Sequence, residues 1–578
     1  MTSTGRGVHV VTTTRTYKGK TYRTHLLRRS YREAGKVKKE TLANLTRLGD
    51  EVVELIRQAL HGEMLQPAGQ RLEVVRSYHH GHVQAVLEAV QRLRLEAILG
   101  SRACRERTLV KAMVAARLLD PQSKLATTRS WQATTLPSLL AVEDANEQDL
   151  YAALDWLLAR QGRIEKRLGQ RHLVTGGLIL YDLSSSYLEG HCCPLGAYGY
   201  NRDGKRGKLQ ITYGLVTTQE GCPVAVSVFE GNTVDATTLL PQVQRLRQRL
   251  GIERLVIVGD RGLIAQVQID QLKRLPGVDW ITALRSGAIR HLVTDALVTP
   301  EQFEGRSLFE FCHRDFPSER LVACYNPELA RHRGAKRQAL LEATQAELAV
   351  LQHQVKAGRL RGSSTIALRV GRVINRYKVA KHFELTITDD TLAVALNTQQ
   401  IQAEAALDGV YVIRTSLSVE AMTAAEAVRS YKYLSHVEQA FRALKTVDLQ
   451  VRPIFHRLAH RVKAHLFLCM LAYYVQWHLM AAWRPLLFHD EDQTAKATRD
   501  PVAPAPRSTA ARSKASSRQL ADGTSVHSFR TLLTHLSTRV RNVCRPAGNS
   551  GASPTFTLDT QPDATQQRAY ELLKTIQV

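Results

Sequence analysis

Two short apolar runs, each followed by an aspartate, place the strongest limits on the fold. Residues 177–181 (GLILY) precede Asp182, and residues 255–259 (LVIVG) precede Asp260. Continuous apolar runs of this length are typical of strands buried on both faces, in sheets covered by helices. Each aspartate is then expected at the carboxyl end of a strand, where ligand sites of such sheets gather. A turn aspartate is the simpler interpretation of one such residue, but two on separate buried strands favour a site.

The segments around these runs predict a mixed α/β fold. We expect a hairpin from residues 210–217 and 223–229, helices at 237–250 and 266–275, and a further strand at 278–284. The resulting order is β-β-β-α-β-α-β. This order favours a mixed sheet with helices packed on its faces and is compatible with a ribonuclease-H-like core.

The chain has 578 residues, which is too long for one core, so several domains are expected. Apolar residues recur at helical spacing from His82 to Leu168, which predicts a helical domain. The segment from His489 to Ser528 is rich in Pro, Ala, Ser and Arg, which predicts a linker. The expected parts are a basic hairpin and helix region (1–60), a helical DNA-binding domain (61–170), a first catalytic part (171–300), an α+β insertion (301–404), a second catalytic part (405–487), a flexible basic linker (488–530) and a C-terminal tail (531–578).

Within the insertion, residues 337–355 predict a long helix whose apolar residues lie near heptad spacing. Such a helix is able to pair with a second copy of the chain. Packing within its own domain is the more common outcome.

The charge of the chain indicates a polyanionic partner. Lys and Arg total 79 against 53 Asp and Glu, which gives a net charge of +26. Nucleic acid is the commonest such partner, and an anionic membrane surface is the rival. We expect no membrane contact and a cytoplasmic, nucleoid-associated protein, because neither a signal peptide nor an apolar run of about 18 residues is present. The basic hairpin expected around Ala34-Gly35 is a candidate DNA contact, and a solvated ribbon is the alternative.

The eight cysteines do not predict a metal centre or a disulfide framework. Their number is low for the length of the chain, so reduced thiols are expected. Cys192 and Cys193 are adjacent and the others are scattered, without a CxxC pair or a Cys/His spacing typical of structural zinc.

A third acid lies in residues 424–445, which predict an amphipathic helix. Tyr431, Glu438 and Lys445 are seven residues apart, so they are expected along one line of that helix, with Arg442 four residues beyond Glu438. The alternative is a solvated helix face with an ion pair between Glu438 and Arg442, which contributes only about 0.3–0.5 kcal/mol.

With these residues the sequence resembles the DDE transposases of bacterial insertion sequences, in the group marked by a Tyr-x2-Arg-x3-Glu-x6-Lys signature. Tyr431, Glu438 and Lys445 match the signature in identity and spacing, and Leu434 stands where the family usually has arginine. The resemblance covers about residues 37–474. It implies a ribonuclease-H-like fold with an insertion before the last helix.

The resemblance further implies that Asp182, Asp260 and Glu438 are catalytic and metal-binding acids. The implied activity is cleavage and strand transfer of double-stranded DNA at inverted-repeat transposon ends and into target DNA. Clustered carboxylates repel one another, so bound cations are expected between them, and oxygen ligands suit Mg²⁺, with Mn²⁺ as a substitute. Because transposition involves two ends, a homodimer in a synaptic complex is expected.

Four further residues are candidate DNA contacts. Arg442 and Lys445 are expected to bind backbone phosphates near the scissile bond. Tyr431 is expected to hold a phosphate or stack on a displaced base, with a buried hydroxyl as the alternative. Arg261 is expected to position the turn after Asp260 or a phosphate. Two other functions remain open at this point: a nuclease without joining activity, and an inactive descendant that regulates by binding DNA.

Overall fold

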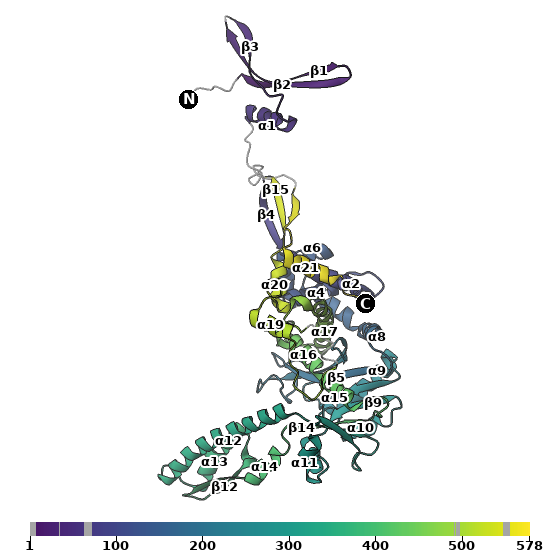
Figure 1. Ribbon diagram of the computed structural model, residues 1–578, viewed down its shortest axis with the longest axis vertical. Coiled ribbons are helices and arrows are strands. Elements are labelled where there is room, and N and C mark those ends of the chain that lie inside the picture. Colours follow the sequence, from purple (N-terminus) through teal and green to yellow (C-terminus); the bar gives the residue numbers. More distant parts are fainter. Residues whose placement is uncertain are drawn as a thin grey trace. The chain divides into compact units, whose positions relative to one another are not determined.

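The computed structural model (Figure 1) describes residues 7–33, 35–62, 72–490, 492, 498–546 and 555–577. They form two compact units. The first comprises Met1–Tyr78 and Arg541–Thr560, and the second comprises His79–Val540 and Gln561–Val578. In the part of the chain that is described, no helix combines the length and the apolar character needed to cross a bilayer.

The first unit begins with an antiparallel sheet of three strands followed by a helix. The strands are β1 (Val8–Tyr17), β2 (Lys20–Glu33) and β3 (Lys36–Asn44), and the helix is α1 (Asp50–Leu60). The predicted hairpin corresponds to β2 and β3, and Ala34 of its turn lies outside the described residues. Gly35 adopts a φ of +78°, which glycine accepts without steric cost.

A second small sheet in this unit joins the two ends of the chain. It has the order β16-β15-β4, formed by Phe556–Asp559, Val540–Pro546 and Leu72–His79. Residues 61–78, predicted to belong to the helical domain, therefore contain a strand. Residues 63–71 and 547–554 lie outside the described part of the chain.

The second unit begins with the predicted helical segment. Its helices are α2 (Gly81–Arg92), α3 (Leu95–Leu99), α4 (Arg105–Leu119), α5 (Lys124–Ser130), α6 (Leu136–Leu140), α7 (Glu147–Leu158) and α8 (Gln161–His172). A capping box starts α7, because the Asn146 side chain accepts from the backbone of Asp149 while the Asp149 carboxylate accepts from the N–H of Asn146. The long apolar helix α17 (Ala459–Ala482) packs against α4 and α7, so the helical segment and the end of the predicted catalytic part share one core.

The centre of the second unit is an eight-stranded mixed sheet in the order β10-β11-β14-β9-β8-β5-β6-β7. The strands that were predicted are β5 (Leu178–Tyr187), β6 (Gln210–Thr218), β7 (Pro223–Glu230), β8 (Leu255–Val258) and β9 (Val278–Ala283). The helices α9 (Leu239–Leu250) and α10 (Gln266–Leu272) lie between them in the chain. The predicted order β-β-β-α-β-α-β is confirmed.

The sheet extends further than predicted, which corrects the limits of the insertion. After α11 (Ser286–Thr294), strands β10 (Leu308–Phe311) and β11 (Arg320–Tyr325) join the main sheet through β14 (Val410–Thr415). The segment that interrupts the sheet is therefore limited to α12 (Pro327–Lys356), α13 (Ser363–Tyr377), β12 (Phe383–Ile387), β13 (Leu392–Leu396) and α14 (Thr398–Ala405). The predicted range 301–404 started too early, because local patterns do not tell which strands pair.

The long helix α12 packs inside its own segment. Leu341, Leu348 and Leu351 of α12 are buried in one apolar cluster with Ile366 and Val370 of α13. The apolar residues of α12 are therefore covered by its own domain, which is the more common of the two outcomes considered from the sequence.

The prediction of a flexible linker at residues 488–530 is wrong for the described residues 498–530. They include α19 (Thr509–Ser517), and Val502 is fully buried, with its carbonyl accepting from Asn326 Nδ2 at 2.9 Å. Beyond them, α20 (Phe529–Ser537) and α21 (Ala564–Leu573) pack onto the core. The prediction followed the polar composition of the segment and overlooked the few apolar residues that pack into the core. Residues 491 and 493–497 lie outside the described residues.

Candidate active site

The parallel register of β5 and β8 brings the two predicted aspartates together. Leu180 on β5 lies opposite Val258 on β8, and Asp182 and Asp260 each follow two residues later. Successive side chains alternate between faces, so residues two apart lie on the same face. Neighbouring strands are about 4.8 Å apart. The register therefore brings Asp182, and Asp260 just beyond the last residue of β8, to the same level of the sheet.

The two aspartates differ in backbone setting. Asp182 was predicted to end its strand, but β5 continues to Tyr187. Within the strand, Asp182 lies opposite Leu215 of the antiparallel partner β6. Asp260 does follow the end of β8, and its Oδ1 accepts from the N–H groups of Gly262 at 3.0 Å and Leu263 at 2.7 Å. Asp260 thus stabilises the turn after β8, and it also lies beside Asp182.

The third acid, Glu438, lies on a helix that packs on the same strands. The predicted helix at 424–445 is helical throughout but divided: the structure has α15 (Ala424–Lys432), α16 (Leu434–Arg442) and a π-helical turn at Ala443–Val447. Helix α16 packs against β5, and its Phe441 ring meets Tyr213 of β6 edge to face, with ring centroids 5.7 Å apart. His436 Nδ1 lies 2.6 Å from the carbonyl oxygen of Gln219 in the β6–β7 turn. These contacts hold the helix while Glu438 stays exposed.

The charges of Asp260 and Glu438 both act on Asp182. Burial raises the pKa of Asp182 to about 7, and repulsion from Asp260 and Glu438 adds to the effect. The Leu183 N–H and the charge of Arg202 act in the opposite direction. Among the described residues, the three carboxylates do not form a group whose ligand atoms all lie within 4.8 Å of one another. Binding a shared ion therefore requires the side chains to move closer.

Tyr431 and Arg261 lie at this site as well. Burial raises the pKa of Tyr431 to about 12, with further contributions from Asp260 and Glu438, while Arg261 lowers it. Tyr431 is partly buried and Arg261 is exposed. Arg442, at the end of α16, is exposed to solvent.

Lys445 lies elsewhere than the seven-residue spacing predicted. In the π-helical turn that contains it, each hydrogen bond spans one more residue than in an α-helix, which rotates the following side chains around the axis. Its side chain is buried, and its Nζ donates to Asp203 Oδ1 at 2.8 Å. Lys445 is therefore buried in an ion pair, whereas Glu438 is exposed.

The sequence analysis did not identify Arg202 and Asp203, which lie in the segment between β5 and β6. Asp203 forms ion pairs with Lys445 and Arg452, and its Oδ2 accepts from the N–H of Tyr187 at 3.1 Å. Arg202 forms an ion pair with Asp235, and its N–H donates to Ser185 Oγ at 3.3 Å. The only signal in the sequence was a glycine-rich basic segment, which is also typical of a surface loop.

A basic cavity of about 460 Å³ lies in the same unit. Arg117 and Lys124 from the helical segment line it together with Arg452, Arg457 and Arg461. Arg452 is also a partner of Asp203. This convergence could not be predicted from the sequence, because the two contributing segments are more than 300 positions apart.

Comparison with known proteins gives two family matches. Residues 182–475, just over half of the chain, match the transposase DDE domain, and residues 10–70 match the N-terminal domain of IS1634 family transposases. The first match begins at Asp182 and contains Asp260 and Glu438. No curated protein matches the chain.

Two solved structures with some similarity are both transposase complexes. The first is a piggyBac transposase synaptic complex with hairpin DNA, with 9% identity, a TM-score of 0.32 and coverage of 78% of this chain and 77% of that chain. The second is a Mos1 transposase paired-end complex with the left transposon end, with 12% identity, a TM-score of 0.14 and coverage of 34% and 66%.

Proposed function

The chain belongs to the DDE transposases of insertion sequences, enzymes that cleave and transfer DNA strands at element ends, and we propose that Asp182, Asp260 and Glu438 are its catalytic acids. The parallel register of β5 and β8 carries this assignment, because it sets two acids side by side at one level of the sheet. The electrostatic repulsion between Asp182 and the other two acids supports the assignment of Glu438 as the third acid.

We propose that these carboxylates hold divalent cations, Mg²⁺ with Mn²⁺ as a substitute. The donor set fits, since it consists of carboxylate oxygens, which hard cations prefer. The raised pKa of Asp182 supports the same conclusion, because a nearby cation would offset the burial and repulsion that disfavour its ionised form. When bound, two such ions activate an attacking oxygen and stabilise the leaving oxygen in an in-line displacement at phosphorus.

The protein side chains around the acids then hold the DNA in place. Arg261 and Arg442 are exposed near the acids, and we assign them to backbone phosphates beside the scissile bond. Tyr431 contacts the same strand through its hydroxyl or ring. Water is the nucleophile in cleavage and the freed 3′-hydroxyl is the nucleophile in strand transfer, so no covalent protein–DNA intermediate forms.

Lys445 has a different role in this proposal. Its buried pair with Asp203 ties the end of the Glu438-bearing helix to β5, because Asp203 also accepts from the N–H of Tyr187. Lys445 is thus a positioning residue, and of the two phosphate contacts expected from the sequence only that of Arg442 is kept in this proposal.

The wider organisation follows from the same assignment. We propose a ribonuclease-H-like core made of β5 to β9 and the α16 region, with end recognition largely in the residues before Leu168. The partners are double-stranded DNA at inverted-repeat ends, target DNA, and a second copy of the chain in a synaptic complex. The protein works in the cytoplasm at the nucleoid.

The first prediction concerns the three acids. We expect Asp182→Asn, Asp260→Asn and Glu438→Gln each to slow cleavage of an end-containing duplex in Mg²⁺ by at least about a hundredfold, since misplaced reacting groups alone cost that much. Binding of the same duplex, measured in Ca²⁺, stays within about twofold because only metal-binding charge is lost.

The matched control is Glu253→Gln, an exposed carboxylate before the opposite end of β8. It should cleave at the wild-type rate, and EDTA should stop cleavage by every variant. An acid variant that cuts within about tenfold of wild type would exclude that residue from the site.

A further inference from the structure

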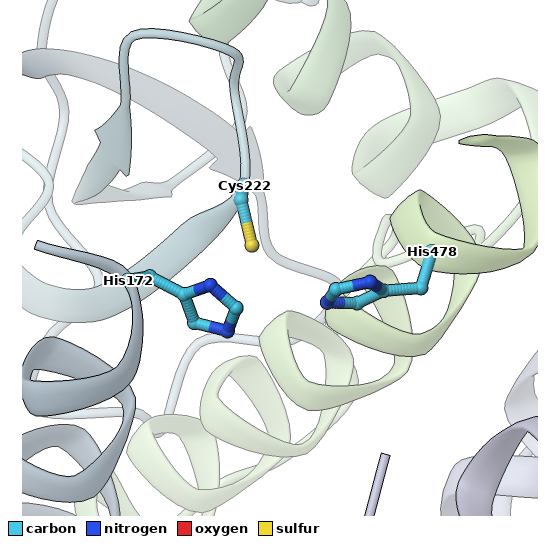
Figure 2. Close-up of side chains that lie close together, drawn as sticks. All are labelled: His172, Cys222 and His478. Atoms are coloured by element: carbon cyan, nitrogen blue, oxygen red, sulfur yellow. The ribbon is translucent and has the colours of Figure 1, made fainter. Parts of the chain in front are cut away.

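A second cluster of potential ligands lies in the same unit, formed by His172, Cys222 and His478 (Figure 2). His172 is the last residue of α8, Cys222 immediately precedes β7, and His478 is on α17. One ligand atom from each side chain lies within 4.8 Å of the other two. Figure 2 shows the Cys222 sulfur directed toward the space between the two imidazole rings.

The ring nitrogens of the two histidines are available for coordination. His172 Nε2 lies 3.0 Å from the Tyr474 hydroxyl, which leaves Nδ1 as its second nitrogen. His478 Nε2 is buried and, in the part of the chain that is described, has no hydrogen-bond partner. A buried polar atom without a partner needs an explanation, and a bound ion would provide one here.

Burial keeps both imidazole rings neutral, whereas it raises the pKa of the Cys222 thiol, so coordination must displace the thiol proton. Burial lowers the pKa of His172 to about 4 and that of His478 to about 3, so both rings are neutral at pH 7. Neutral imidazole is the form that coordinates metals. Glu220 precedes Cys222 by two residues in the same turn, and its negative charge acts on both His172 and Cys222.

We propose that His172, Cys222 and His478 bind a transition-metal ion, with Zn²⁺ as the ion that fits best. Two imidazoles and a thiolate are borderline-soft ligands that Zn²⁺ prefers and Mg²⁺ does not. Coordination breaks the S–H bond of Cys222 and releases the proton to solvent, while sulfur donates its electron pair to the metal. Water or the Glu220 carboxylate supplies the fourth ligand of a tetrahedral site.

The distances require only a small contraction. Zn–S bonds of about 2.3 Å and Zn–N bonds of about 2.0–2.1 Å put the ligands of a tetrahedral ion roughly 3.3–3.7 Å apart. The ligand atoms now lie within 4.8 Å of one another, so side-chain rotations that move each atom by about 1 Å are sufficient to bind the ion. With Nδ1 on the metal, the Nε2–H of His172 would donate to the Tyr474 hydroxyl oxygen and hold the ring, as metal-bound histidines do with their outer-shell partners.

The position of the site indicates a structural role for the metal. It joins α8, the β6–β7 turn and α17, and Trp477 Nε1 already donates to the carbonyl oxygen of Glu220 at 3.3 Å. The carbonyl oxygen of Gln219 in the same turn lies 2.6 Å from His436 on α16. A metal here would fix the turn against which the Glu438-bearing helix rests. This inference stands independently of the catalytic assignment.

The test measures metal binding by the full chain directly. Protein is equilibrated with Zn²⁺ in excess Mg²⁺, which occupies carboxylate sites, and bound zinc is measured by mass spectrometry after gel filtration. Co²⁺ is then substituted, because a sulfur-to-cobalt charge-transfer band in the near ultraviolet reports a thiolate ligand. We expect a single equivalent of zinc and the cobalt band from the wild type.

Variants locate the ligand. Cys222→Ser should abolish the cobalt band, and His478→Gln should weaken zinc binding at least tenfold, an effect of at least the size seen for outer-shell losses of about 10–100-fold. Cys469→Ser is the matched control. Cys469 is buried and its sulfur lies 3.9 Å from His465, yet the pair has no third ligand within reach among the described residues. This variant should keep both the zinc and the band.

Two results would overturn the proposal: wild-type protein that retains no zinc in excess Mg²⁺, or a cobalt band that persists in Cys222→Ser. If Cys222→Ser does not fold, the wild type decides alone. A chelator should then lower its thermal midpoint and added Zn²⁺ should restore it, and an unchanged midpoint counts against the site.

Discussion

Asp182 is the residue in which the electrostatic cost of the proposed catalytic site is concentrated. Its pKa lies near 7 because burial and two neighbouring acids disfavour the ionised form. Between its ordinary value of 3.8 and about 7, the folded chain holds a proton that the unfolded chain has released. The contribution of the Asp182 carboxyl to the free energy of unfolding is therefore fully present below about pH 3.8 and is lost as the pH rises through about 7. A bound cation would reverse that loss.

The second prediction follows from the proton on Asp182. Because metal binding must displace this proton, we expect the Mn²⁺ affinity of the wild type to rise by up to about tenfold per pH unit below about pH 7 and to level off above it. Calorimetric titration at several pH values measures this. Asp182→Asn should bind weakly without that midpoint. A wild-type affinity that does not change with pH would contradict the assignment.

Asp203 is the second residue on which the site depends. Its side chain is 1% exposed and neutralises both Lys445 and Arg452. Removing one member of such a buried group leaves uncompensated charge, which costs about 3–5 kcal/mol.

The third prediction separates a positioning role for Lys445 from a phosphate contact. Asp203→Asn should destabilise the chain by about 3–5 kcal/mol, measured as a lowered thermal midpoint. Lys445→Met should leave the salt dependence of DNA binding unchanged, whereas Arg442→Met should reduce its slope by about 1 without loss of stability. The opposite pattern, with the slope reduced by Lys445→Met, would return the phosphate contact to Lys445.

At the scale of elements, the β2–β3 hairpin concentrates exposed cations on a small sheet. Arg29 and Arg32 are exposed on β2, opposite Glu40 and Val37 of β3. Arginines in such a position bind backbone phosphates and add affinity without sequence selectivity.

The fourth prediction tests this hairpin. Replacing Arg29 and Arg32 by alanine should reduce the slope of log affinity against log salt by about 2, equally for end DNA and random DNA. The matched control replaces Arg369 and Arg372, two exposed arginines of α13 in the insertion, and should leave the slope unchanged. Equal effects of the two pairs would mean that only overall charge matters.

At the scale of the whole molecule, the net charge of +26 sets how copies of the chain meet. Like charges repel, and DNA phosphates neutralise them, so two copies should associate more readily on DNA than without it.

The fifth prediction is that end-containing duplex produces a complex of two chains and two ends, whereas random duplex of the same length does not. Light scattering coupled to gel filtration gives the masses, with the DNA-free chain as the control. Complexes that contain a single chain at saturating end DNA would contradict a synaptic dimer.

The sequence by itself determined the elements and the three acids of the proposed site. Alternation and helical spacing depend on neighbours in the chain, so strands β5 to β9, helices α9 and α10, and the positions of Asp182, Asp260 and Glu438 could be predicted. Only the two strand-end aspartates and the family signature distinguished Glu438 from a residue on a solvated helix face.

Tertiary structure decided what depends on contacts between residues far apart in the chain. The pairing of β11 with β14, the burial of Val502, the ion pair between Lys445 and Asp203, and the approach of His172 to His478 all join segments separated by many positions. No local pattern carries this information, because the free energy that selects such contacts comes from packing and charge neutralisation in the folded core.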